Sequence, residues 1–285
     1  MKNRIFYLSL NLFSLLLLIF TFRKTEKAKR NYFIPLYLAF TGLNYFFEFI
    51  ILIIGKSYEY DPKIMKQQYF DNILGSTVSQ LFVVPTTSMF MNMLKLKARW
   101  SIFFSLLLSG IERLFVKQNV FKQYWWKTPY TTVGLQFFYG LAKFWMIQVI
   151  EKRNKWFELL TIYFSIFVCY STMNFLHVSL FKTCLFTIRL YKNPYRSHVA
   201  ISTLYSAFSS IIFVIAILKN MKYRITTAVC SFLMLETLLI KSKIIKIFSY
   251  RAFYTASLIT KLASLAVGVY IQRLLNKPKV SDILE

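Results

Sequence analysis

The sequence is poor in the residues that form loops, metal sites and catalytic motifs. Its 285 residues include only 7 glycines, 6 prolines and 2 histidines. No Walker loop, GxGxxG, GxSxG or HExxH pattern occurs, which disfavours ATP-driven transport by this chain alone and metal-dependent hydrolysis. We therefore predict that the chain is not an enzyme and that it has no catalytic residues and no cofactor.

Cysteine is scarce as well. Cys169, Cys184 and Cys230 have no CxxC spacing and lie among apolar neighbours. An odd, scattered set of this kind favours small packing residues over disulfides or a zinc site. We predict no metal site.

Acidic residues are few beside the basic ones. The chain has 11 Asp and Glu against 36 Lys and Arg, which gives a formal charge of +25. In a soluble protein this excess would indicate nucleic-acid binding. Here the basic residues lie almost wholly between apolar segments, where anionic lipid head groups attract them. We expect membrane lipids with anionic head groups as partners and no nucleic acid, and the sequence names no protein partner.

Long apolar runs are what the chain has in abundance, since 56% of its residues are apolar and 19% aromatic. The runs last roughly 17 to 25 residues, enough for a helix to cross about 30 Å of hydrocarbon. They are continuously apolar, whereas the strands of membrane barrels alternate. The sequence predicts an all-α fold, a polytopic transmembrane helical bundle of about nine helices, multi-pass in the plasma (cell) membrane. The predicted spans are residues 5–22, 32–55, 72–93, 99–116, 129–150, 156–181, 198–218, 224–241 and 252–274.

Two of these spans carry a glutamate at matching points, in SGIERLFVKQ and LMLETLLIKS. Sliding the chain over itself by 124 residues pairs Glu112 with Glu236. The match extends over 94–150 and 218–274, where twelve of 57 positions are identical. Upstream, TGLNYFF resembles STMNFLH with a shift of six more residues, which a loop insertion explains. We interpret the match as an internal repeat; chance similarity of two apolar segments is the alternative.

The repeat predicts two parallel four-helix units behind one extra helix. An even number of helices gives both units the same orientation, so they are expected to be related by an axis along the membrane normal. The predicted divisions are an N-terminal helix with a basic loop (1–31), a first unit (32–152), a second unit (153–276) and a C-terminal tail (277–285).

The matching glutamates have two interpretations. A charged carboxylate in hydrocarbon is costly, so it is expected to face the bundle interior and meet a partner or a proton. If the units pack about a common axis, Glu112 and Glu236 face each other and one of them holds a proton or cation. Alternatively, each glutamate reaches the lipid head groups, with Arg113 neutralising Glu112.

Other polar residues lie inside predicted spans. Lys143 and Lys261 occupy non-equivalent positions, and each is expected to pair with a glutamate of its own unit as a buried, structural ion pair. Glu48 and Asn44 share one helix face at i, i+4 spacing, which is typical of a polar face against neighbouring helices and also compatible with a substrate path. The candidate intramembrane polar site comprises Glu112, Glu236, Glu48, Asn44, Lys143 and Lys261.

The segments KQNVFKQYWWK and KSKIIKIFSYR carry a cation every five residues, with aromatics between them. Amphipathic aromatics and flexible cations suit the lipid interface. We interpret both segments as membrane anchors; binding of a phosphate-bearing lipid substrate is the alternative. The predicted lipid-interface residues are Lys117, Lys122, Trp125, Trp126, Lys127, Lys241, Lys246 and Arg251.

Pro85 lies inside an apolar span, in GSTVSQLFVVPTTSMF. A proline within a helix removes one backbone hydrogen bond and frees a carbonyl. We expect a kink or break here, with Ser, Thr or water bonding the freed carbonyl.

The stretch ERLFVKQNVFKQYWWKTPYT, with the preceding VVPTTSMF, resembles a family of uncharacterised multi-pass membrane proteins found in spore-forming Firmicutes. The resemblance covers about residues 30–150, and the second unit departs from it where Ser249, Tyr250 and Arg251 replace the double tryptophan. It implies a link to sporulation or germination and no particular activity. The residues that carry it are Glu112, Phe115, Trp126, Lys127, Tyr130 and Thr131.

Three hypotheses for function follow. The duplication, Pro85 and the two glutamates favour secondary transport or permeation of a small solute or ion. The alternative is a non-enzymatic membrane scaffold or regulator, for instance in sporulation or germination. A lipid-modifying enzyme is the third hypothesis and rests only on the basic, aromatic segments.

Overall fold

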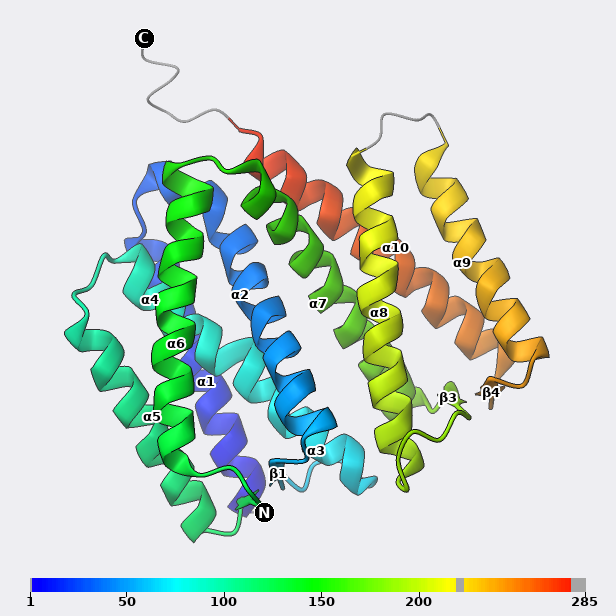
Figure 1. The fold of residues 1–285 in the computed structure, drawn as a ribbon, viewed down its shortest axis with the longest axis horizontal. Coiled ribbons are helices and arrows are strands. Elements are labelled where there is room, and N and C mark those ends of the chain that lie inside the picture. Colours follow the sequence, from blue (N-terminus) through cyan, green and yellow to red (C-terminus); the bar gives the residue numbers. More distant parts are fainter. Residues whose placement is uncertain (1, 219–222, 278–285) are drawn as a thin grey trace. The chain divides into compact units, whose positions relative to one another are not determined.

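The structure is a computed structural model, and it describes residues 2–218 and 223–277 (Figure 1). The described part of the chain is almost entirely helical, so the predicted all-α fold is confirmed. When each helix is counted with its 3₁₀ and π turns, nine helices lie in the described residues, one over each predicted span. Apart from Lys277, the predicted C-terminal tail lies outside the described residues, as do four residues of the repeat match, 219–222.

The helix bounds are as follows. The helices are α1 (Lys2–Lys24), α2 (Phe33–Glu48, preceded by a 3₁₀ turn at Lys27–Tyr32 and continued by a π turn at Phe49–Ile54), α3 (Gln68–Thr77), which runs through a π turn at Val78–Val83 into α4 (Val84–Met93), α5 (Arg99–Lys117), α6 (Thr128–Met146, continued by a π turn at Ile147–Glu151), α7 (Lys155–Phe181), α8 (Pro194–Leu218), α9 (Arg224–Lys241) and α10 (Tyr250–Leu275).

Seven of these helices are long and apolar enough to cross a membrane, which supports a multi-pass membrane protein. α5 and α9 fall short of this composition, because each combines a glutamate with basic residues in no more than 19 residues. Their helical state is confirmed, and their crossing of the membrane stays a prediction. The seven are Asn3–Lys24, Lys27–Ile54, Gln68–Met93, Thr128–Glu151, Lys155–Phe181, Pro194–Leu218 and Tyr250–Leu275.

The chain folds as two compact units, which divide inside α7. The first comprises residues up to Glu158, and the second comprises Leu159–Asn276. α1 belongs to the first unit, where it packs against α4, and α4 in turn packs against α2 and α6. In the second unit, α8, α9 and α10 pack against one another. Gly268 of α10 permits a close approach there, because a Cβ at this position would lie 2.5 Å from Ile217 of α8.

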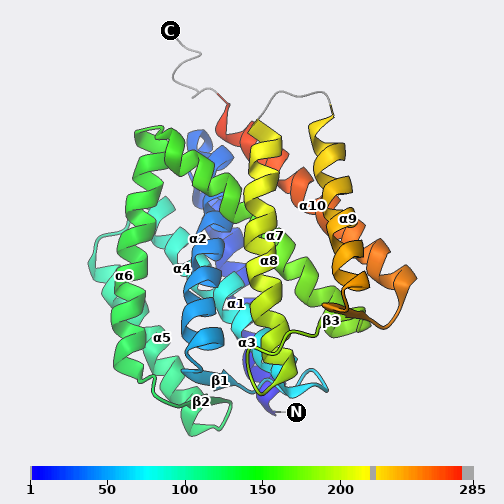
Figure 2. The ribbon, with the colours of Figure 1, turned by 45° about the vertical axis from the view of Figure 1, so that its right-hand side comes forward.

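Each unit also contains a short two-stranded antiparallel sheet. In the first, β1 (Tyr58–Tyr60) pairs with β2 (Phe121–Gln123), and Figure 2 shows the pair at the end of α2 and α5. In the second, β3 (Cys184–Phe186) pairs with β4 (Ile245–Ile247). When α1 is left out, the order of elements is alike: α2, β1, α3–α4, α5, β2 and α6 in the first unit correspond to α7, β3, α8, α9, β4 and α10 in the second.

The registers of the two sheets agree with the sequence match. Lys122 is opposite Glu59 in the first sheet, and Lys246, which lies 124 residues after Lys122, is opposite Leu185 in the second. The turn before the second strand is also alike, since Asn119 and Lys243 both adopt a positive φ at a helix C-terminus. These common features agree with two similar units; their origin by duplication stays a prediction.

Pro85 does not break its helix. The chain instead forms a π turn just before it, and the helix continues to Met93. The carbonyl four residues before Pro85 is that of Leu81, and the Tyr37 hydroxyl of α2 donates to it at 2.6 Å. The side chain that bonds a carbonyl before Pro85 is therefore a tyrosine from another helix and not the expected Ser or Thr, and this hydrogen bond joins α2 to the α3–α4 helix.

Removal of the Tyr37 hydroxyl tests this hydrogen bond between the two helices. Tyr37→Phe removes the side-chain hydrogen bond to the Leu81 carbonyl in an apolar setting, and we expect a loss of about 1 kcal/mol in the free energy of unfolding. Reversible unfolding by sodium dodecyl sulfate in mixed micelles measures it. In a Pro85→Ala background the alanine N–H can bond the same carbonyl, so Tyr37→Phe should cost less; an equal cost in both backgrounds would contradict the assignment.

Candidate functional site

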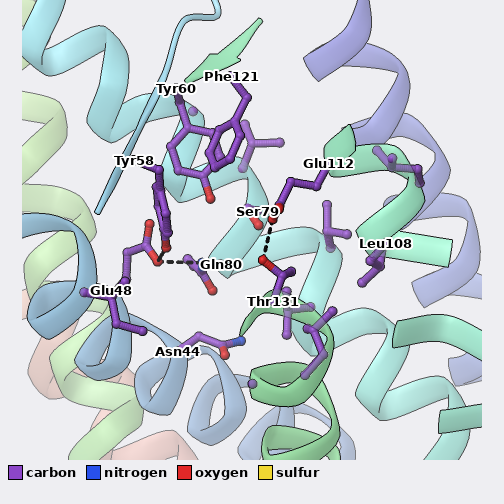
Figure 3. Close-up of a pocket in the computed structure, with 18 of the residues that line it drawn as sticks. Asn44, Glu48, Tyr58, Tyr60, Ser79, Gln80, Leu108, Glu112, Phe121 and Thr131 are labelled. Atoms are coloured by element: carbon purple, nitrogen blue, oxygen red, sulfur yellow. Dashed lines mark hydrogen bonds between the residues drawn. The ribbon is translucent and has the colours of Figure 1, made fainter. Parts of the chain in front are cut away.

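The first unit contains a partly open cavity of about 310 Å³. Residues of α1, α2, α3, α5, α6 and both strands line it, and most of the lining side chains are apolar or aromatic (Figure 3). Two carboxylates, those of Glu48 and Glu112, are part of the wall. No Lys, Arg or His of the described residues lines the cavity. A mainly apolar cavity with a few polar groups is the usual form of a small-molecule site.

Glu48 enters the cavity from the last turn of α2 and is 7% exposed. Its carboxylate accepts three hydrogen bonds, from the Tyr58 hydroxyl at 2.6 Å, the Ser76 hydroxyl at 2.8 Å and the Gln80 amide at 2.9 Å. Gln80 lies in the π turn at Val78–Val83, which widens the helix locally. Three donors suit an ionised carboxylate, which can only accept.

Glu112 enters the cavity from α5 (Figure 3). One oxygen accepts from the Thr131 hydroxyl of α6 at 2.6 Å, and the other accepts from the Gln123 amide of β2 at 2.7 Å. Thr131 in turn accepts from the Trp126 indole N–H at 2.7 Å. The second strand and the start of α6 therefore hold this carboxylate in place.

Asn44 contributes to the cavity wall a polar group that has no hydrogen-bond partner in the part of the chain that the structure describes. It lies one turn before Glu48 on α2, is 5% exposed and lines the cavity. Its amide nitrogen is buried and has no hydrogen-bond partner among the described residues. An unpaired buried donor is costly, so this position is suited to an acceptor carried by a ligand.

Aromatic rings form the wall beside the sheet. Tyr58 and Tyr60 of β1 contact Phe121 of β2, with ring centroids 5.1 and 4.9 Å apart, and Tyr58 also contacts Trp126 at 5.8 Å. Burial, followed by the charge of Glu48, raises the pKa of the Tyr58 and Tyr60 hydroxyls well above the usual value. Both hydroxyls therefore keep their protons, and Tyr58 is a donor to Glu48.

In the second unit, the matching glutamate has a charged partner. Glu236 accepts from the Lys261 ammonium of α10 at 2.7 Å, and the two side chains are 6% and 0% exposed. The hydroxyls of Ser257 and Tyr205 also donate to Glu236, at 2.6 and 3.1 Å, and Lys261 donates to Ser257. The charge of this carboxylate is neutralised within its own unit.

Histidine and asparagine form a second polar group of this unit. The ring of His177 bonds Thr183 at 2.7 Å and Asn174 at 3.1 Å, and Asn174 donates to Ser206 at 3.1 Å. This polar face of α7 is satisfied by neighbouring segments.

The structure places the predicted site residues in three groups. Glu48, Asn44 and Glu112 share the cavity, and Glu236 pairs with Lys261. Lys143 was expected to pair as well, but it is exposed and forms no ion pair among the described residues, because its position on α6 points away from the buried face. That Glu112 and Glu236 face each other stays a prediction, since they belong to separate units.

Two further expectations can be compared with the structure. Arg113 was one candidate to neutralise Glu112; it is exposed and forms no ion pair with Glu112 among the described residues, but its charge still attracts this carboxylate. Trp126 was placed at the lipid interface, yet it lines the cavity, because its indole N–H turns inward to Thr131. The remaining predicted interface residues are exposed: Lys117, Lys122, Trp125, Lys127, Lys241, Lys246 and Arg251.

The donors around Glu48 were not predicted. Ser76 and Gln80 belong to the polar-rich stretch before Pro85, which was the only signal in the sequence that could have found them. Tyr58 lies in a connection, and nothing in its neighbours marks it. No group of three or more His, Cys, Asp or Glu that could hold a metal occurs in the described residues.

Comparison with known proteins finds no matching family model, no matching curated protein and no matching solved structure. The geometry of the cavity and the chemistry of its wall therefore carry the functional argument.

The buried pair of the second unit can be tested for its structural role. Glu236→Gln leaves the Lys261 ammonium buried without a counter-charge, and we expect a loss of about 3 kcal/mol in the free energy of unfolding. Adding Lys261→Met removes the stranded charge and should recover most of this loss. Unfolding in mixed micelles measures the free energy of unfolding of each variant. If the losses of the two single variants add up in the double variant, the two side chains act independently and the pair is not structural.

Proposed function

We propose that this protein carries out secondary transport or permeation of a small solute or ion through the cavity of its first unit. The observation that supports the proposal is a cavity of about 310 Å³ among apolar helices, lined by two carboxylates and by no cationic side chain of the described residues. Ionisable residues at membrane depth usually belong to ion or substrate paths. A purely structural carboxylate would be expected to have a charged partner, as Glu236 has.

The chemistry of such a site is an exchange of positive charges. A carboxylate surrounded by hydrocarbon must be neutralised, either by a bound proton or by a bound cation. Glu48 and Glu112 provide two such positions in one cavity, each held by hydrogen bonds that do not use a charge. Binding of a cationic solute therefore displaces protons, which couples the solute to a proton gradient.

The protein is proposed to act in the plasma membrane. Its exposed lysines and Trp125 next to β2 and β4 suit anionic head groups, which attract cations and hold amphipathic rings at the interface. The resemblance to membrane proteins of spore-forming Firmicutes adds sporulation or germination as the proposed setting.

Proton flux tests the function. The purified protein is placed in proteoliposomes with an acidic external solution and a pH-sensitive dye inside. We expect protons to enter and the dye to report acidification of the interior. Glu112→Gln and Glu48→Gln keep the shape of the side chain but cannot bind and release a proton, so we expect the flux to fall by about tenfold or more.

Glu151→Gln is the matched control, because Glu151 is an exposed carboxylate at the end of α6 away from the cavity lining. It should leave the flux unchanged, and a single elution peak with native helix content verifies the folding of each variant. If both cavity variants conduct like the wild type, the transport proposal is wrong, and a scaffold role becomes the better explanation.

A further inference from the structure

We infer that the ligand of this cavity is a primary organic ammonium ion that carries an apolar body and a hydrogen-bond acceptor, with its ammonium group bound to Glu112. The inference concerns the substrate class and rests on the cavity being the solute site proposed above.

The second unit supplies the chemical precedent. There, the ammonium of Lys261 donates to one oxygen of Glu236 and to the Ser257 hydroxyl, while Ser257 donates to the other oxygen. The aliphatic part of Lys261 is completely buried. A primary ammonium ion on an apolar chain is therefore the cation that this fold holds against a carboxylate.

The first unit has the same carboxylate without the lysine. The shift of 124 residues pairs Glu112 with Glu236 and places Phe137 where the second unit has Lys261. Phe137 contributes to the cavity lining and is 63% exposed, whereas Lys261 is fully buried, so the first unit has no internal cation at this position. Glu112 keeps only neutral donors, Thr131 and Gln123, and an external ammonium ion would complete its surroundings.

The walls of the cavity select an organic cation over a hydrated metal ion. Tyr58, Trp126 and Phe121 present aromatic rings to the space, and aromatic faces attract organic ammonium groups. Leu108, Ile111 and Phe138 add apolar surface that would contact the body of the ligand. A cavity of about 310 Å³ is larger than a single small ion requires.

Asn44 supplies the independent observation. Its side chain contributes to the cavity lining, and its buried amide nitrogen lacks a partner among the described residues, so the wall contains a donor that the chain does not satisfy. A hydroxyl or ester oxygen on the ligand would accept this hydrogen bond. Glu48, one turn further along α2, offers a second negative position for a ligand with two amines.

Calorimetric titration of the full chain in an uncharged maltoside detergent tests the inference. The probe is 2-amino-1-phenylethanol, which is protonated at neutral pH, and the control is 1-phenylpropan-1-ol, in which a methyl group replaces the ammonium. We expect the amine to bind at least about tenfold more tightly than the neutral alcohol.

Variants locate the ammonium group. Glu112→Gln is expected to weaken binding of the amine by about tenfold or more and to leave the alcohol unaffected. Phe137→Lys supplies an ammonium group of the chain at the position that matches Lys261 in the sequence, and it should also weaken binding of the amine, whereas Glu151→Gln should not.

The ammonium group bound in the cavity can belong either to a free amine or to the head group of the lipid phosphatidylethanolamine. In nanodiscs of phosphatidylglycerol, addition of phosphatidylethanolamine will lower the affinity for the probe amine if the lipid head group occupies the cavity. It will have no effect if the natural ligand is a free amine.

Equal affinity for the amine and the alcohol, or an unchanged affinity for the amine in Glu112→Gln, overturns the inference. Amine binding without proton flux would refute the transport proposal alone, and flux without amine binding would refute the ligand class alone.

Discussion

The cost of a carboxylate among apolar helices is the constraint on which the rest of this structure depends. Hydrocarbon supplies neither water nor counter-ions, so the protein itself must stabilise each charge. The second unit meets this requirement with a lysine, and the Lys261 ammonium lies 2.7 Å from Glu236. The first unit meets it only with neutral donors around Glu48 and Glu112. The second unit therefore neutralises its buried carboxylate with its own lysine. The two carboxylates of the first unit line a cavity that has no cationic side chain among the described residues.

Irregular helix geometry positions the groups of the cavity. Glu48 lies at the start of one π turn, Gln80 lies inside another, and the second turn is followed by Pro85. A π turn inserts one residue, rotates the side chains that follow it and opens the backbone locally, which explains why such turns occur at functional sites. The sheet contributes as well, because β1 and β2 bring Tyr58 and Gln123, far apart in the sequence, onto the two carboxylates. A bundle of regular helices alone would not place these donors.

The two units share a framework and differ in the side chains that it carries. Helix order, strand pairing and the positive φ values before the second strands agree between them. Two of the differences concern the surroundings of the matching glutamates, where Lys261 and Ser257 of one unit correspond to Phe137 and Val133 of the other. If duplication produced the two units, exchanges at these two positions gave one glutamate a lysine partner and left the other with neutral donors.

The sequence was enough to predict the all-α class, the positions of the nine helices found in the described residues and the acidic groups at two matching points, because each depends on the local spacing of apolar and polar residues. It also indicated a freed carbonyl at Pro85, since proline chemistry is local. The partner of each polar group could be seen only in the folded protein: Tyr37 bonds the Leu81 carbonyl, Lys261 pairs with Glu236, and Lys143 has no ion-pair partner among the described residues. The inward turn of Trp126 was decided in the same way. Periodicity shows which face of a helix is polar, but the partner comes from another element of the fold, and its approach depends on π turns and strand pairing that leave no regular pattern in the residues.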